Sequence, residues 1–336
     1  MIHTCKICDN GIGNRTFIVR EMQLGLRDEF EYFECSKCGC LQIGEVPVDL
    51  SKYYPNDYYS YLEDRPSIEH PTTGIRSVRV KLTVKILSRH YFSRKNVLGR
   101  WIAKRSSLAG DYPYWVRQQK LDLRLHSNST ILDVGCGKGK LLLDLNLLGF
   151  SNLLGIDPFL KDDVIYQNGV RVLSKNLEQL VQKFDFIMLH HSFEHMPDPL
   201  ATLRKAYELI KPGHYLLLRI PVAGSYAWRK YGVNWVALDA PRHLFLHTSE
   251  SIQILASQAG FEVADVIYDA DGFSHWGSEL YLRDIPLTDE RSPWRNHTFN
   301  VNHAFNKEQL AQFAKLDEEL NDTGEADCAA FYLYKR

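Results

Sequence analysis

From residue 128 onward, short continuous apolar runs alternate with longer stretches that place an apolar residue at every third or fourth position. The apolar runs predict buried strands near 130–135, 152–156, 170–173, 184–190, 214–220, 261–268 and 328–335. The stretches with helical periodicity predict helices over about 138–148, 159–167, 198–210, 249–259 and 305–321. A regular alternation of strand and helix predicts an α/β fold, in which helices cover both faces of a parallel sheet.

The first of these strands runs directly into a glycine-rich turn. Residues 131–139 read Ile-Leu-Asp-Val-Gly-Cys-Gly-Lys-Gly. Gly135, Gly137 and Gly139 lack a Cβ, so the backbone can adopt positive φ and approach a ligand closely. The free N–H groups at the start of the next helix face the same point. The turn therefore predicts a binding site for a nucleotide-like ligand.

Two carboxylates indicate what kind of ligand this is. A dinucleotide-binding loop has the spacing Gly-x-Gly-x-x-Gly and seats a pyrophosphate on the helix N-terminus. Here the spacing is Gly-x-Gly-x-Gly, and Asp133 precedes it. A carboxylate at that position would repel a pyrophosphate, but it can pair with the ammonium group of an aminoacyl ligand. Asp157, at the end of the next strand, can accept hydrogen bonds from two ribose hydroxyls.

The glycine turn with Asp133 and Asp157 resembles the cofactor site of the class I S-adenosylmethionine-dependent methyltransferases. Five further segments are similar to motifs of that family, and they occur at 184–190, 191–199, 209–218, 241–248 and 258–261. The resemblance covers roughly residues 128–335. It implies a Rossmann-like seven-stranded sheet whose last strand is antiparallel, and an enzyme that transfers a methyl group from S-adenosylmethionine.

The resemblance also implies a set of cofactor contacts at the ends of the strands. The expected contacts are Asp133, Gly135, Cys136, Gly137, Gly139, Asp157, Pro158, Asn176, Leu177 and His190. Asp133 and the glycines would cradle the methionine part, and Asp157 would hold the ribose. Pro158 or Phe159 would flank the adenine. Cys136 is interpreted as a small filler of the loop rather than as a nucleophile.

Histidines supply the candidate chemistry. Methyl transfer from a sulfonium is an in-line displacement whose rate depends largely on positioning, and an oxygen or nitrogen acceptor must also lose a proton. His191 and His195 follow the strand 184–190, and His243 lies in a later loop. Each is a candidate general base, because imidazole titrates near neutral pH. A metal ion bound by these histidines is the less favoured alternative, since the family rarely needs one.

Two insertions, 221–247 and 270–327, are expected to roof the cofactor site and to hold the methyl acceptor. Ligands of open α/β sheets bind beyond the carboxyl ends of the strands, and both insertions are rich in Tyr, Trp and His. The candidate acceptor-binding residues are Tyr226, Trp235, Asp239 and Arg242. Arg242 would pair with a phosphate or carboxylate of the acceptor, or alternatively form an ordinary surface salt bridge.

Cysteine spacing predicts a second module. Five of the seven cysteines lie in the first 40 residues, as Cys5-x-x-Cys8 and Cys35-x-x-Cys38-Gly-Cys40. Two such pairs can place four thiolates at the corners of a tetrahedron, the geometry of structural zinc. A disulfide framework is disfavoured by the absence of an export signal and by the two isolated cysteines. We expect a zinc-ribbon-like module over residues 1–50, with Cys40 as the alternative to Cys38.

Residues 51–127 are interpreted as an aromatic and basic helical connector before the methyltransferase domain at 128–336. Five tyrosines lie within 53–61, and they either dock the first module or form a lid over the ligand. Ten Lys and Arg and no acid lie within 75–110, which predicts basic amphipathic helices. These helices are either the solvated face of a cap or a contact for a membrane surface or a polyphosphate.

Composition narrows the class of partner. The chain has 40 Lys plus Arg against 41 Asp plus Glu, so no net charge attracts nucleic acid. No run approaches the roughly 18 apolar residues that would span a bilayer. The first residues also lack the apolar core of a secretory signal, and we therefore expect a cytoplasmic protein.

The order of a cysteine module, a Tyr-Tyr-Pro-x-x-Tyr-Tyr segment and a methyltransferase domain resembles enzymes of bacterial surface-polysaccharide and sugar-modifying pathways. It implies methyl transfer to a small molecule or glycan, such as a nucleotide-linked sugar. An RNA base methyltransferase is the alternative, but the acidic first module disfavours it. A scaffold without activity is disfavoured by the intact glycine loop and Asp157. The fold alone does not select the acceptor.

Overall fold

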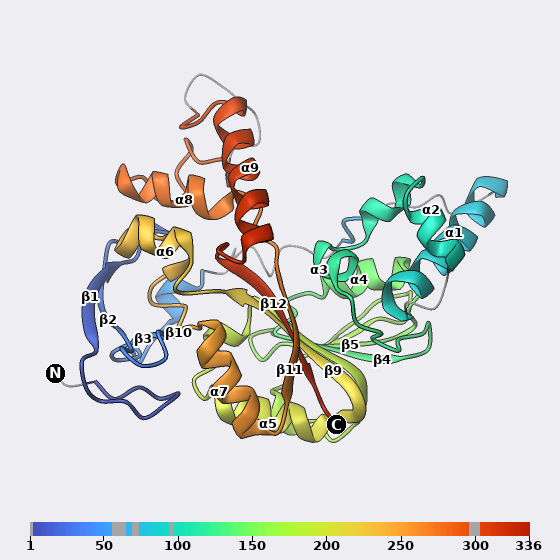
Figure 1. Ribbon diagram of the computed structural model, residues 1–336, viewed down its shortest axis with the longest axis horizontal. Coiled ribbons are helices and arrows are strands. Elements are labelled where there is room, and N and C mark those ends of the chain that lie inside the picture. The colour runs from blue at the N-terminus through green and yellow to red at the C-terminus, as the bar shows by residue number, and fades with distance from the viewer. Residues whose placement is uncertain (1–2, 56–64, 69–73, 94–96, 296–302) are drawn as a thin grey trace.

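A computed structural model describes residues 3–55, 65–68, 74–93, 97–295 and 303–336 of the chain. These residues form a central sheet of eight strands and a smaller sheet of four (Figure 1). The central sheet has the order β11-β12-β9-β8-β4-β5-β7-β6. Its strands are β4 (Thr130–Val134), β5 (Asn152–Ile156), β6 (Val164–Ile165), β7 (Arg171–Leu173), β8 (Phe184–His190), β9 (Ile210–Pro221), β11 (Glu262–Tyr268) and β12 (Cys328–Tyr334).

The seven predicted strands are confirmed, and the short β6 extends the sheet at one edge. β4, β5, β7, β8 and β9 run parallel, whereas β12 is antiparallel to both of its neighbours, β9 and β11. The α/β fold with an antiparallel last strand is therefore the one that the sequence predicts. The carboxyl ends of β4, β5, β8 and β9 meet at one edge of the sheet, where a ligand is expected.

Four of the five predicted helices are present. They are α4 (Lys140–Leu147), α5 (Pro199–Leu209), α7 (Ser249–Ala259) and α9 (Lys307–Thr323). The helix predicted over 159–167 is wrong, because this segment consists of turns and β6. The Asp157 carboxylate accepts a hydrogen bond from the backbone N–H of Phe159, and the Asp163 carboxylate accepts one from that of Ser174. Aspartate side chains that bind backbone groups in this way favour turns over a helix.

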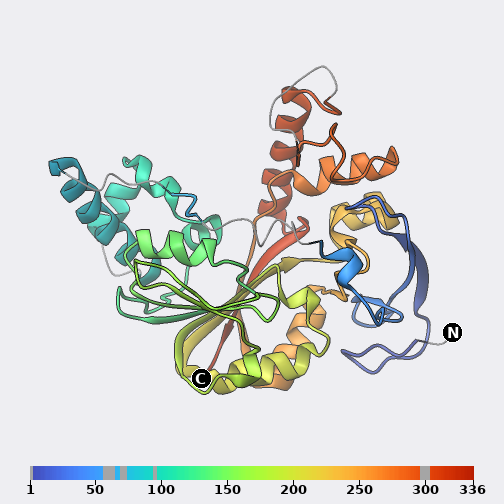
Figure 2. The same ribbon diagram turned by 180° about the vertical axis from the view of Figure 1, so that it is seen from behind.

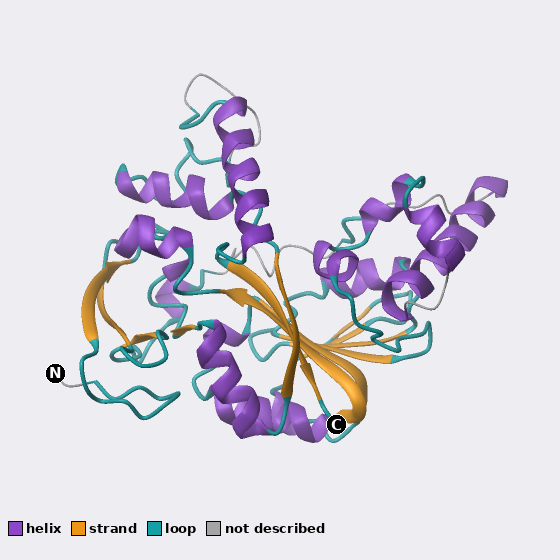
Figure 3. Cartoon of the chain, viewed as in Figure 1, coloured by secondary structure: helices purple, strands orange, loops and turns teal. Residues whose placement is uncertain are grey.

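Helices cover both faces of the central sheet (Figures 2 and 3). In β9, Leu216 and Leu218 belong to the core beneath α5 and α7, whereas Leu217 belongs to the core on the opposite face, beneath α4. This alternation follows from the two-residue period of a strand. Both faces of the sheet are therefore buried, which explains the continuous apolar runs of its strands.

The cysteine-rich segment forms the smaller sheet, but not alone. Its strands are β1 (Arg15–Arg20), β2 (Glu29–Glu34), β3 (Leu41–Ile43) and β10 (Phe245–Leu246). β10 comes from the insertion at 221–247 and pairs antiparallel with β3. Phe33 and Leu41 also belong to the hydrophobic core on the face of the central sheet that α5 and α7 cover. A boundary at residue 50 stays a prediction, and the two parts share both a sheet and a core.

The remaining helices include α1 (Gly74–Ser93), α2 (Val97–Ala103) and α3 (Tyr114–Gln118) of the connector, and α6 (Tyr226–Tyr231) and α8 (Phe273–Leu282) of the insertions. In α1, Leu87 and Phe92 are buried, whereas Val78 and Leu82 are 67% and 60% exposed. Val78 and Leu82, although spaced like the apolar face of a helix, therefore do not lie on the buried side of α1. Contact of this basic segment with a membrane stays a prediction, and Arg94 and Lys95 lie outside the described residues.

Within the described ranges, no helix combines the length and the hydrophobicity needed to cross a membrane. Of the predicted tyrosine segment, only Tyr53 and Tyr54 can be placed, because Tyr58, Tyr59 and Tyr61 lie outside the described residues. The Tyr53 hydroxyl donates to Asp28, so this tyrosine docks onto the cysteine-rich segment. Tyr54 lies elsewhere, beside the ligand site.

Candidate active site

The glycine loop between β4 and α4 has the backbone that its sequence predicts. Gly135, Gly137 and Gly139 have φ values of +73°, +53° and +81°, which L side chains rarely adopt. A Cβ on Gly135 would lie 2.5 Å from Cβ of Ser192, and one on Gly139 would lie 2.7 Å from Cγ2 of Val172. The loop can therefore pack against the turn after β8 and against β7 only with glycine at positions 135 and 139.

Asp157 holds this loop in place. Its Oδ2 accepts a hydrogen bond of 2.9 Å from the Gly137 N–H, and its Oδ1 accepts one of 3.0 Å from the Phe159 N–H. Each carboxylate oxygen retains a second lone pair, which leaves acceptors for two ribose hydroxyls. Asp133 is buried in β4, and burial, followed by the charge of Asp157, raises the pKa of its carboxyl group well above the usual value. A cationic ammonium group at this position would stabilise the ionised form.

The residues expected around the adenine lie at the ends of β5 and β7. Pro158 and Asn176 are exposed, and Leu177 is buried in a short 3-10 turn that Asn176 caps. Phe159 is 73% exposed, and its ring stacks on Tyr54 with centroids 6.1 Å apart. Tyr54 therefore lies at the edge of the expected cofactor site, which favours the lid interpretation for this tyrosine.

Two other residues expected to contact the cofactor, Cys136 and His190, pack against neighbouring residues of the protein. The Cys136 sulfur fills the space above Gly155, since a Cβ on that glycine would lie 2.4 Å from it. Burial raises the pKa of the Cys136 thiol, which agrees with a filler rather than a nucleophile. His190 packs against Trp115 at 5.1 Å between ring centroids, and burial lowers its pKa well below the usual value.

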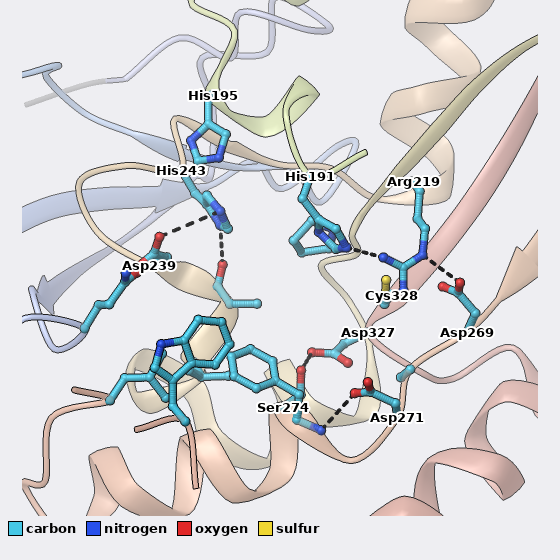
Figure 4. A pocket seen from close by; sticks show the side chains of 18 residues that line it. His191, His195, Arg219, Asp239, His243, Asp269, Asp271, Ser274, Asp327 and Cys328 are labelled. Atoms are coloured by element: carbon cyan, nitrogen blue, oxygen red, sulfur yellow. Dashed lines mark hydrogen bonds and ion pairs between the residues drawn. The ribbon is translucent and has the colours of Figure 1, made fainter. Parts of the chain in front are cut away.

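A cavity of about 340 Å³ opens beyond the ends of β8, β9 and β11 (Figure 4). The predicted insertions line it together with the central sheet and Gln23 of the cysteine-rich segment. Its lining residues include His191, His195, Arg219, Asp239, His243, Asp269, Asp271, Phe273, Ser274, Trp294 and Asp327. The volume suits a small organic molecule, and the lining combines carboxylates, imidazoles and aromatic rings.

One wall of the cavity is a chain of three polar side chains. The Arg219 Nε donates a 2.6 Å hydrogen bond to Oδ2 of Asp269, and Nη1 of Arg219 contacts Nε2 of His191 (Figure 4). Because arginine only donates, this contact requires an unprotonated Nε2. His191 has φ +48°, a conformation that costs a non-glycine residue free energy and is concentrated at functional sites. His191 is thus held by Arg219 and exposed at the end of β8.

The opposite wall contains His195 and His243. Nδ1 of His195 lies 2.8 Å from the Arg242 carbonyl oxygen, and Nδ1 of His243 lies 2.7 Å from that of Ala237. The two imidazole rings contact each other at 4.7 Å between centroids. Glu194 is fully buried behind them. Burial alone would raise the pKa of Glu194, but the contact with His191 and the nearby His243 and His195 outweigh it and lower the pKa to about 2.

The four candidate acceptor-binding residues have different places in the structure. Asp239 lines the cavity. Arg242 does not, because its fully buried guanidinium is held by Asp239 at 2.6 Å and by Glu21 at 2.9 Å. Trp235 is also fully buried and donates its Nε1–H to Asp327 at 2.6 Å. Tyr226 packs against His275 outside the cavity. Arg242 thus forms a buried ion pair, neither a surface salt bridge nor an acceptor contact.

Sequence reasoning missed Arg219, Asp269, Asp271, Ser274 and Asp327 as parts of the site. A signal for Arg219 exists, because it interrupts the apolar run of β9. Asp269 and Asp327 immediately flank β11 and β12, at the same edge of the sheet as the glycine loop. Their positions at strand ends are therefore visible in the sequence, but their convergence on one cavity depends on the strand order.

The cysteine cluster has the geometry that a metal requires. The sulfurs of Cys5 and Cys38 lie 3.6 Å apart, and those of Cys8 and Cys35 lie 3.5 Å apart. All four sulfurs lie within 4.8 Å of one another. Sulfurs at the corners of a zinc tetrahedron are about 3.8 Å apart, given a Zn–S bond of about 2.3 Å. These four thiols therefore fit a zinc ion.

Cys40 points away from this cluster. Its sulfur lies 3.9 Å from Nδ1 of His247, and it is absent from the group of four. The turn of the second pair is closed by Gly39, whose N–H donates to the Cys35 carbonyl at 2.8 Å and whose φ is +67°. The Thr248 hydroxyl donates to the Cys38 carbonyl at 2.6 Å. The cysteine cluster is thereby tied to the segment that carries His243.

Comparison with known proteins agrees with the geometry of the loop. Residues 109–266 match a methyltransferase domain family. The chain is 28% identical over 187 residues to the ubiquinone biosynthesis O-methyltransferase of Pseudomonas putida strain GB-1, covering 50% of this chain and 71% of that protein. It is 27% identical over the same length to the protein of that name from Pseudomonas aeruginosa strain UCBPP-PA14, with the same coverage.

Among solved structures, the chain is similar to the cyclopropane synthase MmaA2 from Mycobacterium tuberculosis. The two share 18% identity and a TM-score of 0.41, over 73% of this chain and 88% of that one. The family match places a methyltransferase domain on the part of the chain that contains the glycine loop, Asp157 and the turn with Glu194 and His195. Residues 109–266 of the chain are therefore a methyltransferase domain.

Proposed function

We propose that the enzyme transfers the methyl group to a hydroxyl of a small polyhydroxylated acceptor, a nucleotide-linked sugar or another precursor of a glycan. The observation that carries this proposal is the composition of the cavity. Asp239, Asp271 and Asp327 line it beside the aromatic rings of Phe273 and Trp294. Carboxylates accept hydrogen bonds from hydroxyl groups, and aromatic faces pack against the apolar face of a sugar ring.

The relatives support oxygen as the acceptor atom, since they are named O-methyltransferases. The volume of about 340 Å³ supports a small molecule over a polymer. The proposal keeps the cofactor contacts expected from the sequence, with Asp133 and the glycines at the methionine part, and Asp157 at the ribose. It also keeps Pro158, Asn176 and Leu177 near the adenine.

We propose His191 as the general base. It adjoins Ser192, which packs against Gly135 of the cofactor loop, so its imidazole lies near the expected position of the sulfonium. The acceptor hydroxyl would replace Arg219 at Nε2 of His191 and give up its proton there. The acceptor oxygen then bonds to the methyl carbon, and the carbon–sulfur bond breaks with its electron pair remaining on sulfur. His195 and His243 would orient the acceptor from the opposite wall.

We further propose that Cys5, Cys8, Cys35 and Cys38 hold a structural zinc ion. The sulfur distances support this assignment, as do the N–H groups directed at the sulfurs, among them the side-chain amide of Gln42 at 3.0 Å from Cys5. With four protein ligands, such an ion has no open position for a reactant. Its role would be to fold the module that contributes Gln23 to the cavity.

Calorimetry with S-adenosylhomocysteine tests the cofactor site. We expect binding to the wild-type chain and a loss of at least tenfold in affinity in Asp157→Ala, because the carboxylate fixes the loop and faces the ribose. Asp162→Ala changes an exposed carboxylate five residues further along and serves as the matched control. Equal affinities in the two variants would remove the assignment of Asp157.

Radiolabelled methyl transfer tests the acceptor. The chain is incubated with labelled S-adenosylmethionine and with panels of nucleotide-linked sugars, phenolic small molecules or bulk RNA. Label in the sugars supports the proposal. Label confined to phenolic compounds or to RNA would overturn the sugar acceptor, and the second of these results would instead favour the RNA methyltransferase.

A further inference from the structure

Glu194 is a buried carboxylate without a hydrogen-bond partner. Its side chain is 1% exposed, and neither carboxylate oxygen has a hydrogen-bonding group within reach among the described residues. The nearest side-chain nitrogens are Nδ1 of His191 at 3.6 Å and Nε2 of His243 at 3.9 Å, both from Oε1. An ionised carboxylate in such a place is costly unless a cation accompanies it.

Two histidines beside Glu194 each retain a lone pair on one ring nitrogen. Nδ1 of His195 and Nδ1 of His243 each face a backbone carbonyl oxygen, at 2.8 Å and 2.7 Å. A carbonyl only accepts, so each Nδ1 carries the proton and each Nε2 carries a free lone pair. Metal-bound histidines are held in this way, with the second ring nitrogen donating to a carbonyl or carboxylate.

The three side chains are close enough to share one ion. One nitrogen of His195, one of His243 and one carboxylate oxygen of Glu194 lie within 4.8 Å of one another. Ligand atoms about 2.1 Å from a metal ion are about 3 to 3.5 Å apart. The 3.9 Å between Nε2 of His243 and Oε1 of Glu194 therefore needs to close by less than about 1 Å.

The charge of the surroundings favours a doubly charged cation. The guanidinium of Arg242 contacts the carboxylates of Glu21 and Asp239. His243 lies between Asp239 and a third carboxylate, that of Glu194. With neutral histidines this group has a formal charge of −2. A divalent ion would neutralise this charge.

We infer that Glu194, His195 and His243 bind a divalent transition-metal ion of the type that prefers nitrogen and oxygen ligands, such as Zn²⁺, Fe²⁺ or Co²⁺. His195 and His243 line the cavity, so the remaining coordination positions would face the acceptor. Two histidines and one glutamate with an open position are a known ligand set of catalytic zinc. An ion there would lower the pKa of a bound hydroxyl and ease proton loss to His191. This role rests on the proposed function, whereas metal binding does not.

Cobalt uptake by the full-length chain, purified with its cysteine site loaded, tests the inference. Co²⁺ is added, unbound metal is removed, and both the metal content and the visible spectrum are measured. We expect one additional Co²⁺ per chain, with a weak d–d spectrum and no thiolate charge-transfer band. Glu194→Gln and His243→Ala should each lower the affinity at least tenfold. His126→Ala, which changes an exposed histidine far from the cavity, should bind Co²⁺ like the wild type.

His191→Asn is a second control, because His191 lines the cavity but is not among the three ligands. This variant should retain Co²⁺ binding while losing methyl transfer. Far-ultraviolet circular dichroism and binding of S-adenosylhomocysteine verify that each variant is folded, and His195→Ala replaces any variant that is not. No additional Co²⁺ in the wild type, or equal uptake by the folded ligand variants, would overturn the site.

The outcomes separate this inference from the proposed acceptor. Cobalt uptake is measured without an acceptor, so failure to methylate sugars leaves it unaffected. Conversely, methyl transfer to sugars by a chain that takes up no additional Co²⁺ would overturn the metal site and leave the proposed function in place.

Discussion

Arg242 and Glu21 lie 221 residues apart in the sequence, yet they form an ion pair of 2.9 Å whose side chains have no exposed surface. The Arg242 guanidinium also donates to Asp239 and to the backbone carbonyl of Tyr53. Arg242 therefore joins the cysteine-rich segment, the connector and the wall of the cavity. A buried arginine that pairs with two carboxylates is far more sensitive to substitution than a surface residue.

Arg242→Met should destabilise the folded chain by about 3–5 kcal/mol, because it leaves the carboxylates of Glu21 and Asp239 buried without a cation. Urea denaturation, monitored by tryptophan fluorescence, measures this change in the free energy of unfolding. The matched control is Arg20→Ala, which removes an exposed ion pair to Asp284 between the cysteine-rich segment and the insertion at 270–327. Arg20→Ala should unfold at nearly the wild-type urea concentration, and equal effects of the two variants would contradict the importance of burial.

Gly135→Ala should abolish measurable binding of S-adenosylhomocysteine. The new Cβ would lie 2.5 Å from Cβ of Ser192 at a residue with φ +73°, so the loop must move. Gly149→Ala is the control for the effect of φ alone, since Gly149 has φ +99° and no atom within 4 Å of an added Cβ. Gly149→Ala should cost about 1 kcal/mol of stability and leave the affinity unchanged, as calorimetry would show. Wild-type affinity in Gly135→Ala would refute this account of the loop.

Cys38→Ser and Cys40→Ser should differ in metal content, although both cysteines are buried and only two residues apart. Cys38 belongs to the group of four thiols, whereas Cys40 faces His247. Elemental analysis should find about one structural zinc per chain in Cys40→Ser and a loss of this zinc in Cys38→Ser. Zinc loss should also lower the melting temperature, because zinc binding contributes to folding. The reverse result would show that Cys40 is the ligand.

Asp327 should make stability depend on pH. Burial raises the pKa of its carboxyl group to about 6, against the hydrogen bonds from Ser274 and Trp235, which lower it. Between the unfolded value near 3.8 and about 6, the folded chain holds a proton that the unfolded chain has lost. The wild type should therefore lose up to roughly 3 kcal/mol of stability relative to Asp327→Asn as the pH rises from 4 to 7.

Urea denaturation of both chains at several pH values measures this difference. Asp162→Asn, which changes an exposed carboxylate, is the control, and its difference from the wild type should stay constant with pH. A constant difference between the wild type and Asp327→Asn would show that Asp327 is ionised in the folded chain throughout this range.

The sequence by itself determined the features that depend on neighbouring residues. The glycines of the loop, the seven strands and four helices follow from local periodicity and from the conformational freedom of glycine. The Thr248 cap and the Gly260 stop of α7 are local in the same sense. The cofactor class was also predictable, because Asp133, the glycines and Asp157 lie within 25 residues of one another. The helix over 159–167 was predicted wrongly because aspartate side chains there bind the backbone.

Only the tertiary structure decided the composition of the cavity and the pairing of Arg242. Arg219 meets Asp269 because β9 and β11 are the two neighbours of β12 and both residues lie at the same edge of the sheet. Asp327 meets Trp235 because an insertion folds back over the sheet. β3 pairs with β10, although Phe245 lies 203 residues after its partner Gln42 (245 − 42). Charges and hydrogen-bonding groups far apart in sequence find each other only when the strand order brings them together, since their energies depend on distance and burial rather than on spacing along the chain.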